Sequence, residues 1–562
     1  MSKHSEDGVT YSQFACIGSG FSAIALGATL KRWHGITDVR FFERHSDLGG
    51  TWFANQYPGC ACDVPSVLYS FSFAPNPDWS ETLAPADEIR CYLDKVAQEY
   101  DLRSKMVFNA TVKKCEWIEA THRWRIFVHN GNTDRLVIHE SQFLFNGAGV
   151  LVHPRKADIP GIESFSGPVF HSSQWRHDVS LKDKNVILIG NGCTASQIFP
   201  KIKDKTRHLT QFARSKHWVV PSVELPQWKI IRQIYRWVPG ALATARFVMF
   251  LALENELRGF FNSASGLSFR ESRRKIAEQY MRSEAPKKYH DLLIPDFEIG
   301  CKRRIFDSGY LRALCAENVT LTNEKILEVC PDGVRTEDGF TEADVIILAT
   351  GFETNVVLAG IEVVGRNGLT AVDHWNANGG VGAYNTTVMS GFPNFFLALG
   401  PNSVTGNTST VMAIENGINF ALRLVKPVLE GRATSVDVKP EAEIRDIQEL
   451  QDALQDTVYS TGCGAWYGRT GNGDKPPRNA STYPWWQPQF WYRCLFPAYE
   501  DFNYTDYKKE TAIGTVFRGL LWTGTFATAF GAMLYGRRNH WDIRQYMQFL
   551  GASSRHLITF HK

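Results

Sequence analysis

Two glycine-rich turns constrain this 562-residue chain more than any other feature. The first turn reads GSGFSA, Gly18–Ala23, and the second reads GNGCTA, Gly190–Ala195. Each follows a short apolar run of strand type, Phe14–Ile17 and Asn185–Ile189, and precedes an apolar-periodic helix. Glycines at such a turn let the backbone approach a pyrophosphate, whose charge then meets the N-terminus of the helix. The sequence therefore predicts an α/β fold with two Rossmann-like dinucleotide-binding domains.

The residues after the next strand of each unit predict which nucleotide binds there. Glu43 ends the predicted strand Val39–Phe42, at about 20 residues past the first turn, where an acid holds a ribose hydroxyl. The matching strand of the second unit, Leu209–Phe212, is followed by Arg214 and by no acid. A guanidinium suits a ribose 2′-phosphate, so the second unit is predicted to bind NADPH rather than NADH. A solvated arginine is the alternative interpretation of Arg214.

Composition narrows the class of protein. Apolar residues make up 44% and charged residues 21%, as in an ordinary globular enzyme, and the net charge of +3 gives no reason to expect nucleic acid. The chain has neither the GxSxG nor the HExxH motif of hydrolases. Its eleven cysteines match no zinc spacing, so no metal is predicted. Their scatter and the polar N-terminus, which has no signal-peptide pattern, favour a reduced, intracellular protein.

Three further stretches identify the family. Phe165–Trp175 reads FSGPVFHSSQW, Gly49–Asp63 reads GGTWFANQYPGCACD, and Cys301–Leu311 reads CKRRIFDSGYL. FxGxxxHxxxW between two glycine turns, together with (A/G)GxWxxxx(F/Y)PGxxxD, resembles the flavoprotein (type I) Baeyer–Villiger monooxygenases. One position departs, because Arg176 stands where the family has Pro or Asp. By motif order the resemblance covers Tyr11 to Trp486.

The resemblance implies FAD in the first domain, NADPH in the second, and O2 and a ketone as co-substrates. In this family a flavin peroxide attacks the carbonyl, and one oxygen atom is inserted beside it to give an ester or a lactone. An N- or S-oxygenating flavin monooxygenase is the alternative, which Trp175 and the GGxW…PGxxxD match disfavour. A flavin- and NADP-binding protein that no longer oxygenates is disfavoured by the joint presence of Asp63, Lys302 and Arg303.

The same resemblance implies the site residues. Arg303 would be the active-site arginine, Asp63 the carboxylate beside it, and His171 a hinge residue at the domain junction rather than a base. The expected FAD contacts are Gly18, Gly20, Ala23, Glu43, Arg44, Gly50, Thr51, Trp52, Asp63, Val64, Tyr69 and Val112. The expected NADP contacts are Gly190, Asn191, Gly192, Cys193, Thr194, Ala195, Ser196, Gln197, Arg214, Ser215, Lys302 and Trp466.

The expected FAD-binding domain is discontinuous, with residues 1–150 and 351–486, and the NADP-binding domain takes residues 151–224 and 301–350. A helical insertion, 225–300, contains the apolar stretch Gly240–Leu253, which is expected to be a packed helix because Arg246 interrupts it. In the C-terminal extension, 487–562, the uncharged run Gly519–Gly536 could span a bilayer, lie in its interface or pack on the protein. The chain is thus expected in the cytoplasm or attached to a membrane through its C-terminus.

The sequence leaves the ketone and its regiochemistry open. An aromatic content of 13% with 16 Trp favours a bulky, apolar substrate.

Overall fold

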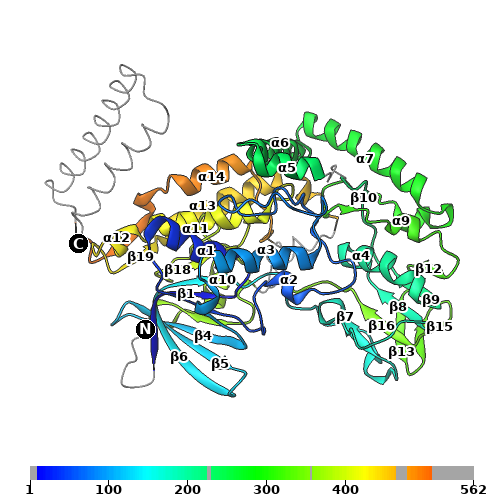
Figure 1. Cartoon of the computed structure of the whole chain (residues 1–562), viewed down its shortest axis with the longest axis horizontal. Helices are drawn as coiled ribbons and strands as arrows, with labels where there is room; N and C mark the ends of the chain where they lie inside the picture. The colour runs from blue at the N-terminus through cyan, green and yellow to red at the C-terminus, as the bar shows by residue number, and fades with distance from the viewer. Residues whose placement is uncertain (1–8, 224–228, 355–356, 464–477, 509–562) are drawn as a thin grey trace. The chain divides into compact units, whose positions relative to one another are not determined.

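A computed structural model describes residues 9–223, 229–354, 357–463 and 478–508 (Figure 1). Trp466 and the run Gly519–Gly536 lie outside these ranges. The chain divides into a first unit, Met1–Lys426 with Ser435–Asn503, and a second unit, Pro427–Thr434 with Tyr504–Lys562. In the second unit the amide of Thr434 donates to the carbonyl of Thr505 at 3.0 Å. Everything that follows concerns the first unit.

The first glycine turn belongs to an eight-stranded sheet with the order β17-β4-β5-β6-β1-β2-β3, to which β18 adds beside β6. Helix α1 (Phe21–Thr29) follows β1 directly, as predicted, and the β1 side chains of Phe14 and Ile17 are buried. The strands are β1 (Thr10–Ile17), β2 (Val39–Phe42), β3 (Met106–Val107), β4 (Ala110–Ile118), β5 (Arg123–Asn130), β6 (Arg135–Asn146), β17 (Glu362–Val364) and β18 (Phe395–Leu397).

Strands β4 and β5 pair antiparallel, as the alternation of their residues predicts, but they do not form a separate sheet. The reason is the length of β6. Its first half pairs antiparallel with β5, and its second half pairs parallel with β1 and β18. One long strand therefore joins the antiparallel part to the parallel part, and both share one hydrophobic core that contains Val112, Trp124 and Phe395.

The second glycine turn belongs to a wholly parallel five-stranded sheet with the order β12-β9-β8-β16-β7. Strands β8 and β16 read NVILI and VIIL, the continuous apolar runs of parallel strands covered on both faces. Helix α4 (Cys193–Ile202) follows β8. The five strands are β7 (Val169–His171), β8 (Asn185–Ile189), β9 (His208–Phe212), β12 (Val319–Thr322) and β16 (Val345–Leu348). The predicted pair of Rossmann-like folds is confirmed.

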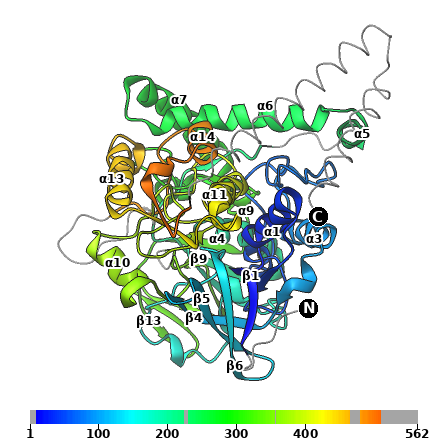
Figure 2. The same ribbon diagram turned by 90° about the vertical axis from the view of Figure 1, so that its left-hand side faces the viewer.

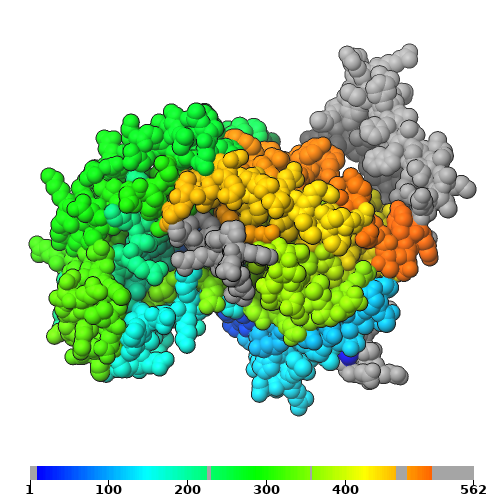
Figure 3. All heavy atoms as spheres, turned by 180° about the vertical axis from the view of Figure 1, so that it is seen from behind, coloured from blue at the N-terminus to red at the C-terminus, as the bar shows by residue number. Residues whose placement is uncertain are grey.

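The helices that follow β7, β8 and β9 in the sequence form the predicted helical insertion. They are α5 (Lys229–Trp237), α6 (Ala241–Glu256) and α7 (Ala264–Glu284), between the short paired strands β10 (Val219–Val220) and β11 (Ile305–Phe306). Figure 2 shows α5, α6 and α7 at the top, on the side away from the ends of β4, β5 and β6. Figure 3 shows the molecule from behind. The surface is hollowed between two groups of residues, one coloured teal and green and the other coloured blue and yellow-green.

The remaining elements of the first unit are α2 (Thr51–Ala54), α3 (Ala86–Glu99), α8 (His290–Leu293), α9 (Tyr310–Ala313), α10 (Ala371–Ala377), α11 (Thr410–Leu424), α13 (Pro440–Gln455) and α14 (Gln487–Leu495), with β13 (Ile326–Cys330), β14 (Gly333–Thr336), β15 (Phe340–Glu342) and β19 (Ser435–Val438). Most of α12 (Lys426–Leu429) and half of β20 (Phe502–Thr505) belong to the second unit.

The expectation for the apolar stretch Gly240–Leu253 is wrong in one respect. It forms a helix, but Phe247 and Val248 on its outer face are 60% and 59% exposed. Arg246 faces the protein instead, where it donates to the carbonyl of Val67 at 2.6 Å. Within the described ranges, no individual helix has the length and apolar character of a membrane span. Helix α5 and residues Ala241–Phe260, bent by 110°, meet that criterion only as a pair.

The structure also corrects the expectation of fully reduced cysteines. Cys301 and Cys463 form a disulfide across 162 residues of sequence. Both belong to a small hydrophobic cluster with Leu257, Phe260 and Val458. Cys301 directly precedes Lys302, so the disulfide connects the Lys–Arg segment to the chain after α13. Spacing in the sequence does not reveal such a distant pair.

Reduction of this disulfide should lower stability without unfolding the protein. Closing a loop of this length typically contributes roughly 2–4 kcal/mol to the free energy of unfolding. We expect dithiothreitol to lower the thermal midpoint of the wild type, and the double variant Cys301→Ser, Cys463→Ser to show the lower midpoint with or without reductant. A variant with a wild-type midpoint, or one that still responds to dithiothreitol, would contradict the assignment. Mass spectrometry after alkylation counts the free thiols directly.

Candidate active site

The first glycine turn forms a cradle without side chains beside the N-terminus of α1. Gly18 has a φ of +96°, and a Cβ there would lie 2.9 Å from the carbonyl oxygen of Gly147. Gly50 has a φ of +54°, and its Cβ would lie 3.0 Å from the Cα of Gly20. The backbones of the GSGFSA turn and of the GGTW segment therefore touch. Residues with side chains would push the two apart, and the bare surface fits a pyrophosphate.

Glu43 is held at the edge of this cradle. Its side chain is buried, and its Oε2 accepts hydrogen bonds from the amide and the hydroxyl of Ser19, both at 2.9 Å. Its Oε1 accepts the amide of His45 at 2.9 Å. The carboxylate is thus fixed against the turn by backbone and side-chain donors. Its position fits the ribose of a dinucleotide whose pyrophosphate lies on the turn.

The other residues expected to contact FAD lie on the elements around this cradle. Arg44 donates to the carbonyl of Val152 at 2.9 Å, and the indole nitrogen of Trp52 lies 3.3 Å from the hydroxyl of Tyr69. Thr51 and Trp52 begin helix α2. Four of the expected residues have buried side chains that form part of the core: Ala23, Trp52, Val64 and Val112. Val112 shares its cluster with the ends of β1 and β2.

The second glycine turn has the same construction. Gly190 has a φ of +118°, and a Cβ there would lie 2.3 Å from the carbonyl oxygen of Ala349. Gly192 precedes the first turn of α4, and no described atom lies within 4 Å of its Cβ position. No side chain caps this helix, so its first amides, those of Cys193 and Thr194 among them, face that space. Ala195 and Ser196 are buried on the inner face of α4. This end of the helix fits a second pyrophosphate.

Two cations lie near the end of β9. Burial and the charge of Arg214 lower the pKa of Lys302, while Asp296 acts in the opposite direction. The Nζ of Lys302 lies 4.6 Å from the ring centre of Phe297. Asn191 donates to the carbonyl of Ser215, which ties the glycine turn to this basic segment. The positive charges of Arg214 and Lys302 repel each other, and a phosphate dianion between them would relieve that repulsion. Their approach fits the 2′-phosphate of NADP.

Arg303 and Asp63 meet although 240 residues separate them in the sequence. The Nε of Arg303 donates to the Oδ2 of Asp63 at 2.6 Å, and both side chains are about one third exposed, 28% and 31%. Burial raises the pKa of the Asp63 carboxyl, but the charge and hydrogen bond of Arg303 more than offset this, so the pKa lies below its ordinary value. The two residues therefore form a half-buried ion pair at neutral pH.

Asp63 also lines a cavity of about 1110 Å3 between the two nucleotide-binding parts. Its lining includes Trp52 and Tyr57 from the first nucleotide-binding part and Cys193 and Gln197 of α4 from the second. Ordinary small-molecule sites measure about 300–1,000 Å3, so this one has room for a large substrate or for a substrate beside a nicotinamide.

Sequence reasoning did not select Asn55 and Tyr57, which line this cavity. The hydroxyl of Tyr57 donates to the Oε1 of Gln197 at 2.9 Å, and the Nε2 of Gln197 donates to the carbonyl of Ala61 at 3.0 Å. These bonds connect the two nucleotide-binding parts. The Oδ1 of Asn55 is buried and accepts no hydrogen bond from the part of the chain that the structure describes. Tyr57 occupies the (F/Y) position of the motif that ends at Asp63, and this motif position could have identified Tyr57 from the sequence.

Comparisons with known proteins agree with this geometry. The family model for flavin-binding monooxygenase-like proteins matches residues 12–356. A Baeyer–Villiger monooxygenase of Streptomyces coelicolor is 36% identical over 475 residues, which cover 84% of this chain and 88% of that protein. The chain belongs to the flavoprotein Baeyer–Villiger monooxygenase family.

Solved structures support the same assignment. Cyclohexanone monooxygenase from Rhodococcus sp. Phi1 bound to NADP+ superposes with a TM-score of 0.76 and 25% identity, and covers 88% of this chain and 99% of its own. The complex of OTEMO with FAD and NADP gives 0.75 and 25%, over 88% of this chain and 99% of that one. The predicted FAD and NADPH cofactors and the predicted Baeyer–Villiger activity are confirmed, and the N- or S-oxygenating alternative is not favoured.

In this Baeyer–Villiger monooxygenase His171 lies where the chain crosses from one sheet to the other. Its Nε2 is 3.1 Å from the carbonyl oxygen of Gly351, to which it donates, and its ring packs edge-on against Phe352 at 5.5 Å. Burial lowers the pKa of His171. Because the ring bonds to the backbone of the crossing segment, its geometry agrees with a hinge rather than a base, a role that stays a prediction.

Removal of Arg214 tests the NADPH site of the monooxygenase. Arg214→Ala should raise the Michaelis constant for NADPH and leave that for NADH nearly unchanged, because only NADPH carries the 2′-phosphate. Steady-state kinetics with both cofactors measures the two constants. Lys216→Ala, two residues further along, is the matched control and should change neither. An equal loss for both cofactors in Arg214→Ala would rule out the assignment.

Proposed function

We propose that this monooxygenase oxidises a bulky, apolar ketone to an ester or lactone, with Arg303 and Asp63 as its catalytic residues. One observation carries the proposal: the 2.6 Å contact between Arg303 and Asp63, which joins two family motifs beside the cavity. The size of that cavity supports a large substrate, and its aromatic wall at Trp52 and Tyr57 supports an apolar one.

The role of Arg303 follows from where charge develops. When oxygen is inserted beside a carbonyl, negative charge builds up on the oxygen atoms at the reacting centre. A guanidinium that is already fixed in place stabilises this charge without reorganisation, and it does so more strongly in a water-poor site. Arg303 presents further N–H donors besides the Nε that bonds to Asp63, because a guanidinium carries five.

Asp63 sets the position of Arg303. The carboxylate is ionised at neutral pH, because its pKa lies below the ordinary value, and its hydrogen bond restricts the guanidinium to one orientation. It also balances the arginine charge in a half-buried site, where an unpaired charge would be costly. Asp63 is therefore a positioning residue for the guanidinium as well as a wall of the cavity.

The cofactor residues have assigned tasks under this proposal. FAD, when bound, supplies the electrons that activate O2. The glycine turn at Gly18 and Gly20 and the carboxylate of Glu43 would hold its pyrophosphate and ribose. The turn at Gly190 and Gly192 would hold the pyrophosphate of NADPH, and Arg214 with Lys302 its 2′-phosphate. Tyr57 and Gln197 would keep the two parts in register across the cavity.

A substrate panel tests the reaction. Purified protein with FAD and NADPH is offered cyclic, linear and aryl ketones of increasing size, and ester or lactone is sought by mass spectrometry. A thioether and a tertiary amine of matched size are the control substrates. Oxygen insertion into the larger ketones supports the proposal. Sulfoxide or N-oxide as the main product, with no ester from any ketone, would contradict it.

A further inference from the structure

Helices α5 and α6 expose large apolar side chains to solvent, whereas an ordinary surface helix buries them. Their large apolar side chains face outward and are each at least 42% exposed: Ile230, Ile234, Trp237, Phe247, Val248 and Leu251. On α5 they are spaced by four and three residues, and on α6 Phe247 and Val248 lie four and three residues before Leu251, so each set lies on one face of its helix. Both helices lie on the same side of the first unit in Figures 1 and 2.

Two arginines of the same helices fasten them to the protein. Arg246 faces inward and donates to the carbonyl of Val67 at 2.6 Å and to the hydroxyl of Ser70 at 2.5 Å. Arg236 pairs at the surface with the Oδ1 of Asp78 at 2.5 Å. These contacts hold the helix pair against residues 67–78, while the exposed apolar side chains point away from the protein.

The charges of the helix pair are unevenly placed. Residues 229–253 contain four basic residues, Lys229, Arg232, Arg236 and Arg246, and no acidic residue, whereas Glu254 and Glu256 stand at the far end of α6. The exposed apolar face therefore has basic residues beside it on α5, Lys229, Arg232 and Arg236, which matches an anionic lipid surface that takes apolar side chains between its headgroups and attracts cations to its rim. The bend of 110° suits helices that lie in a membrane surface rather than cross it.

We propose that the α5–α6 face binds the surface of an anionic lipid bilayer. This binding would place the catalytic cavity at the bilayer, because Ser80, Leu83 and Val223 line the cavity and Arg236 fastens α5 to Asp78 nearby. An apolar ketone partitions into lipid and would be taken up from there. The last step rests on the proposed function, whereas the binding does not.

Vesicle binding tests the proposal with the full-length protein carrying FAD. The wild type should float with vesicles of phosphatidylcholine and phosphatidylglycerol, less with phosphatidylcholine alone, and less again at high salt. The double variant Phe247→Glu, Leu251→Glu should lower the partition coefficient by at least about tenfold. Val372→Glu, a similarly exposed apolar residue of α10, is the matched control and should bind like the wild type.

Three results would overturn the proposal. The wild type could stay in solution with both kinds of vesicle, or the double variant could bind as tightly as the wild type, which would locate binding elsewhere in the chain. Light scattering could instead show a dimer that the double variant converts to a monomer, with no vesicle binding, so that the face would join two copies. FAD absorbance of the variant checks its fold.

Measurements of ketone turnover distinguish a failure of lipid binding from a failure of the proposed function. For a small, water-soluble ketone, kcat/KM should be the same in the wild type and the double variant. For an apolar ketone supplied in vesicles, kcat/KM should fall in the variant in step with the lost vesicle binding. Vesicle binding without turnover of any ketone would refute the proposed function but would still support lipid binding by α5 and α6.

Discussion

Arg303→Ala is expected to stop ester or lactone formation while NADPH still reduces the bound FAD. Reduction needs the two nucleotides in place, and the glycine turns, Arg214 and Lys302 provide that binding. Oxygen insertion additionally needs the fixed positive charge beside Asp63. Removing a preorganised donor of this kind costs on the order of a hundredfold to a thousandfold in rate. Stopped-flow reduction followed by product analysis measures the two steps separately.

Two further variants sharpen this experiment. Arg303→Lys should restore only part of the activity, because an ammonium cannot reproduce the fork of a guanidinium. Arg304→Ala is the matched control, since its neighbouring guanidinium bonds to the Oε2 of Glu256 at 2.8 Å and not to Asp63. Product formation by Arg303→Ala near the wild-type rate would remove this residue from the mechanism. A strong loss of flavin reduction would instead assign it to nicotinamide binding.

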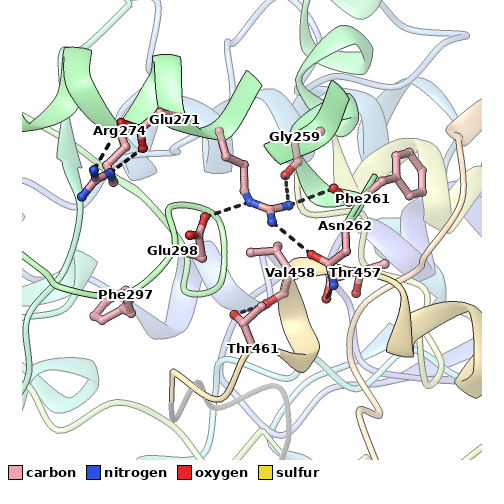
Figure 4. Close-up of polar contacts among 12 residues, drawn as sticks. Gly259, Phe261, Asn262, Glu271, Arg274, Phe297, Glu298, Thr457, Val458 and Thr461 are labelled. Carbon is pink, nitrogen blue, oxygen red and sulfur yellow. Dashed lines mark hydrogen bonds and ion pairs between the residues drawn. The ribbon is translucent and has the colours of Figure 1, made fainter. Parts of the chain in front are cut away.

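Arg270→Leu is expected to cost at least about 3 kcal/mol in the free energy of unfolding, because each buried acceptor that loses its donor costs about 1–3 kcal/mol. The guanidinium of Arg270 is 2% exposed and donates to the carbonyls of Gly259 and Phe261, to the Oδ1 of Asn262 and to Glu298. Figure 4 shows these acceptors converging on one point. The substitution leaves them without a donor inside the protein, where water replaces it poorly.

The same helix offers the control. Arg274 lies one turn after Arg270 and pairs with Glu271 at the surface, at 2.9 Å and with both side chains more than 40% exposed (Figure 4). Exposed pairs contribute only about 0–1 kcal/mol, so Arg274→Leu should be nearly neutral. Urea-induced release of FAD, followed by its fluorescence, compares the two variants. Equal midpoints would show that the Arg270 cluster is not a stabilising centre.

The parts of the site that could be predicted are those built from local backbone geometry. A glycine turn between a strand and a helix commonly binds a dinucleotide, so Gly18 and Gly190 could be assigned before their φ angles were known, whereas Gly50 came from the family resemblance. Glu43 followed from its distance to the turn. The contact between Arg303 and Asp63 came from the family resemblance, since no spacing rule connects residues 240 positions apart.

Other features depend on tertiary packing and left no local signal. The sequence showed that Gly240–Leu253 is apolar, but whether its side chains meet protein or solvent depends on their neighbours, and Phe247 and Val248 are exposed rather than packed. Cys301 and Cys463 become neighbours only when the Lys–Arg segment lies beside the chain after α13. Arg270 resembles any other arginine of a charged helix until the turn at 259–262 closes around it.

The pairing of β18 with β6 has a consequence for how the protein is made. The sheet that holds FAD is completed only when Phe395–Leu397 reaches a strand that ends at Asn146, and the entire second nucleotide unit is synthesised between them. At about 5–20 residues per second, a ribosome needs roughly 10–50 s for that interval. During this time the apolar edge of β6 lacks its final neighbour, and the inserted unit can fold first. Slow translation or chaperone binding within residues 147–394 should therefore determine the yield of FAD-loaded protein.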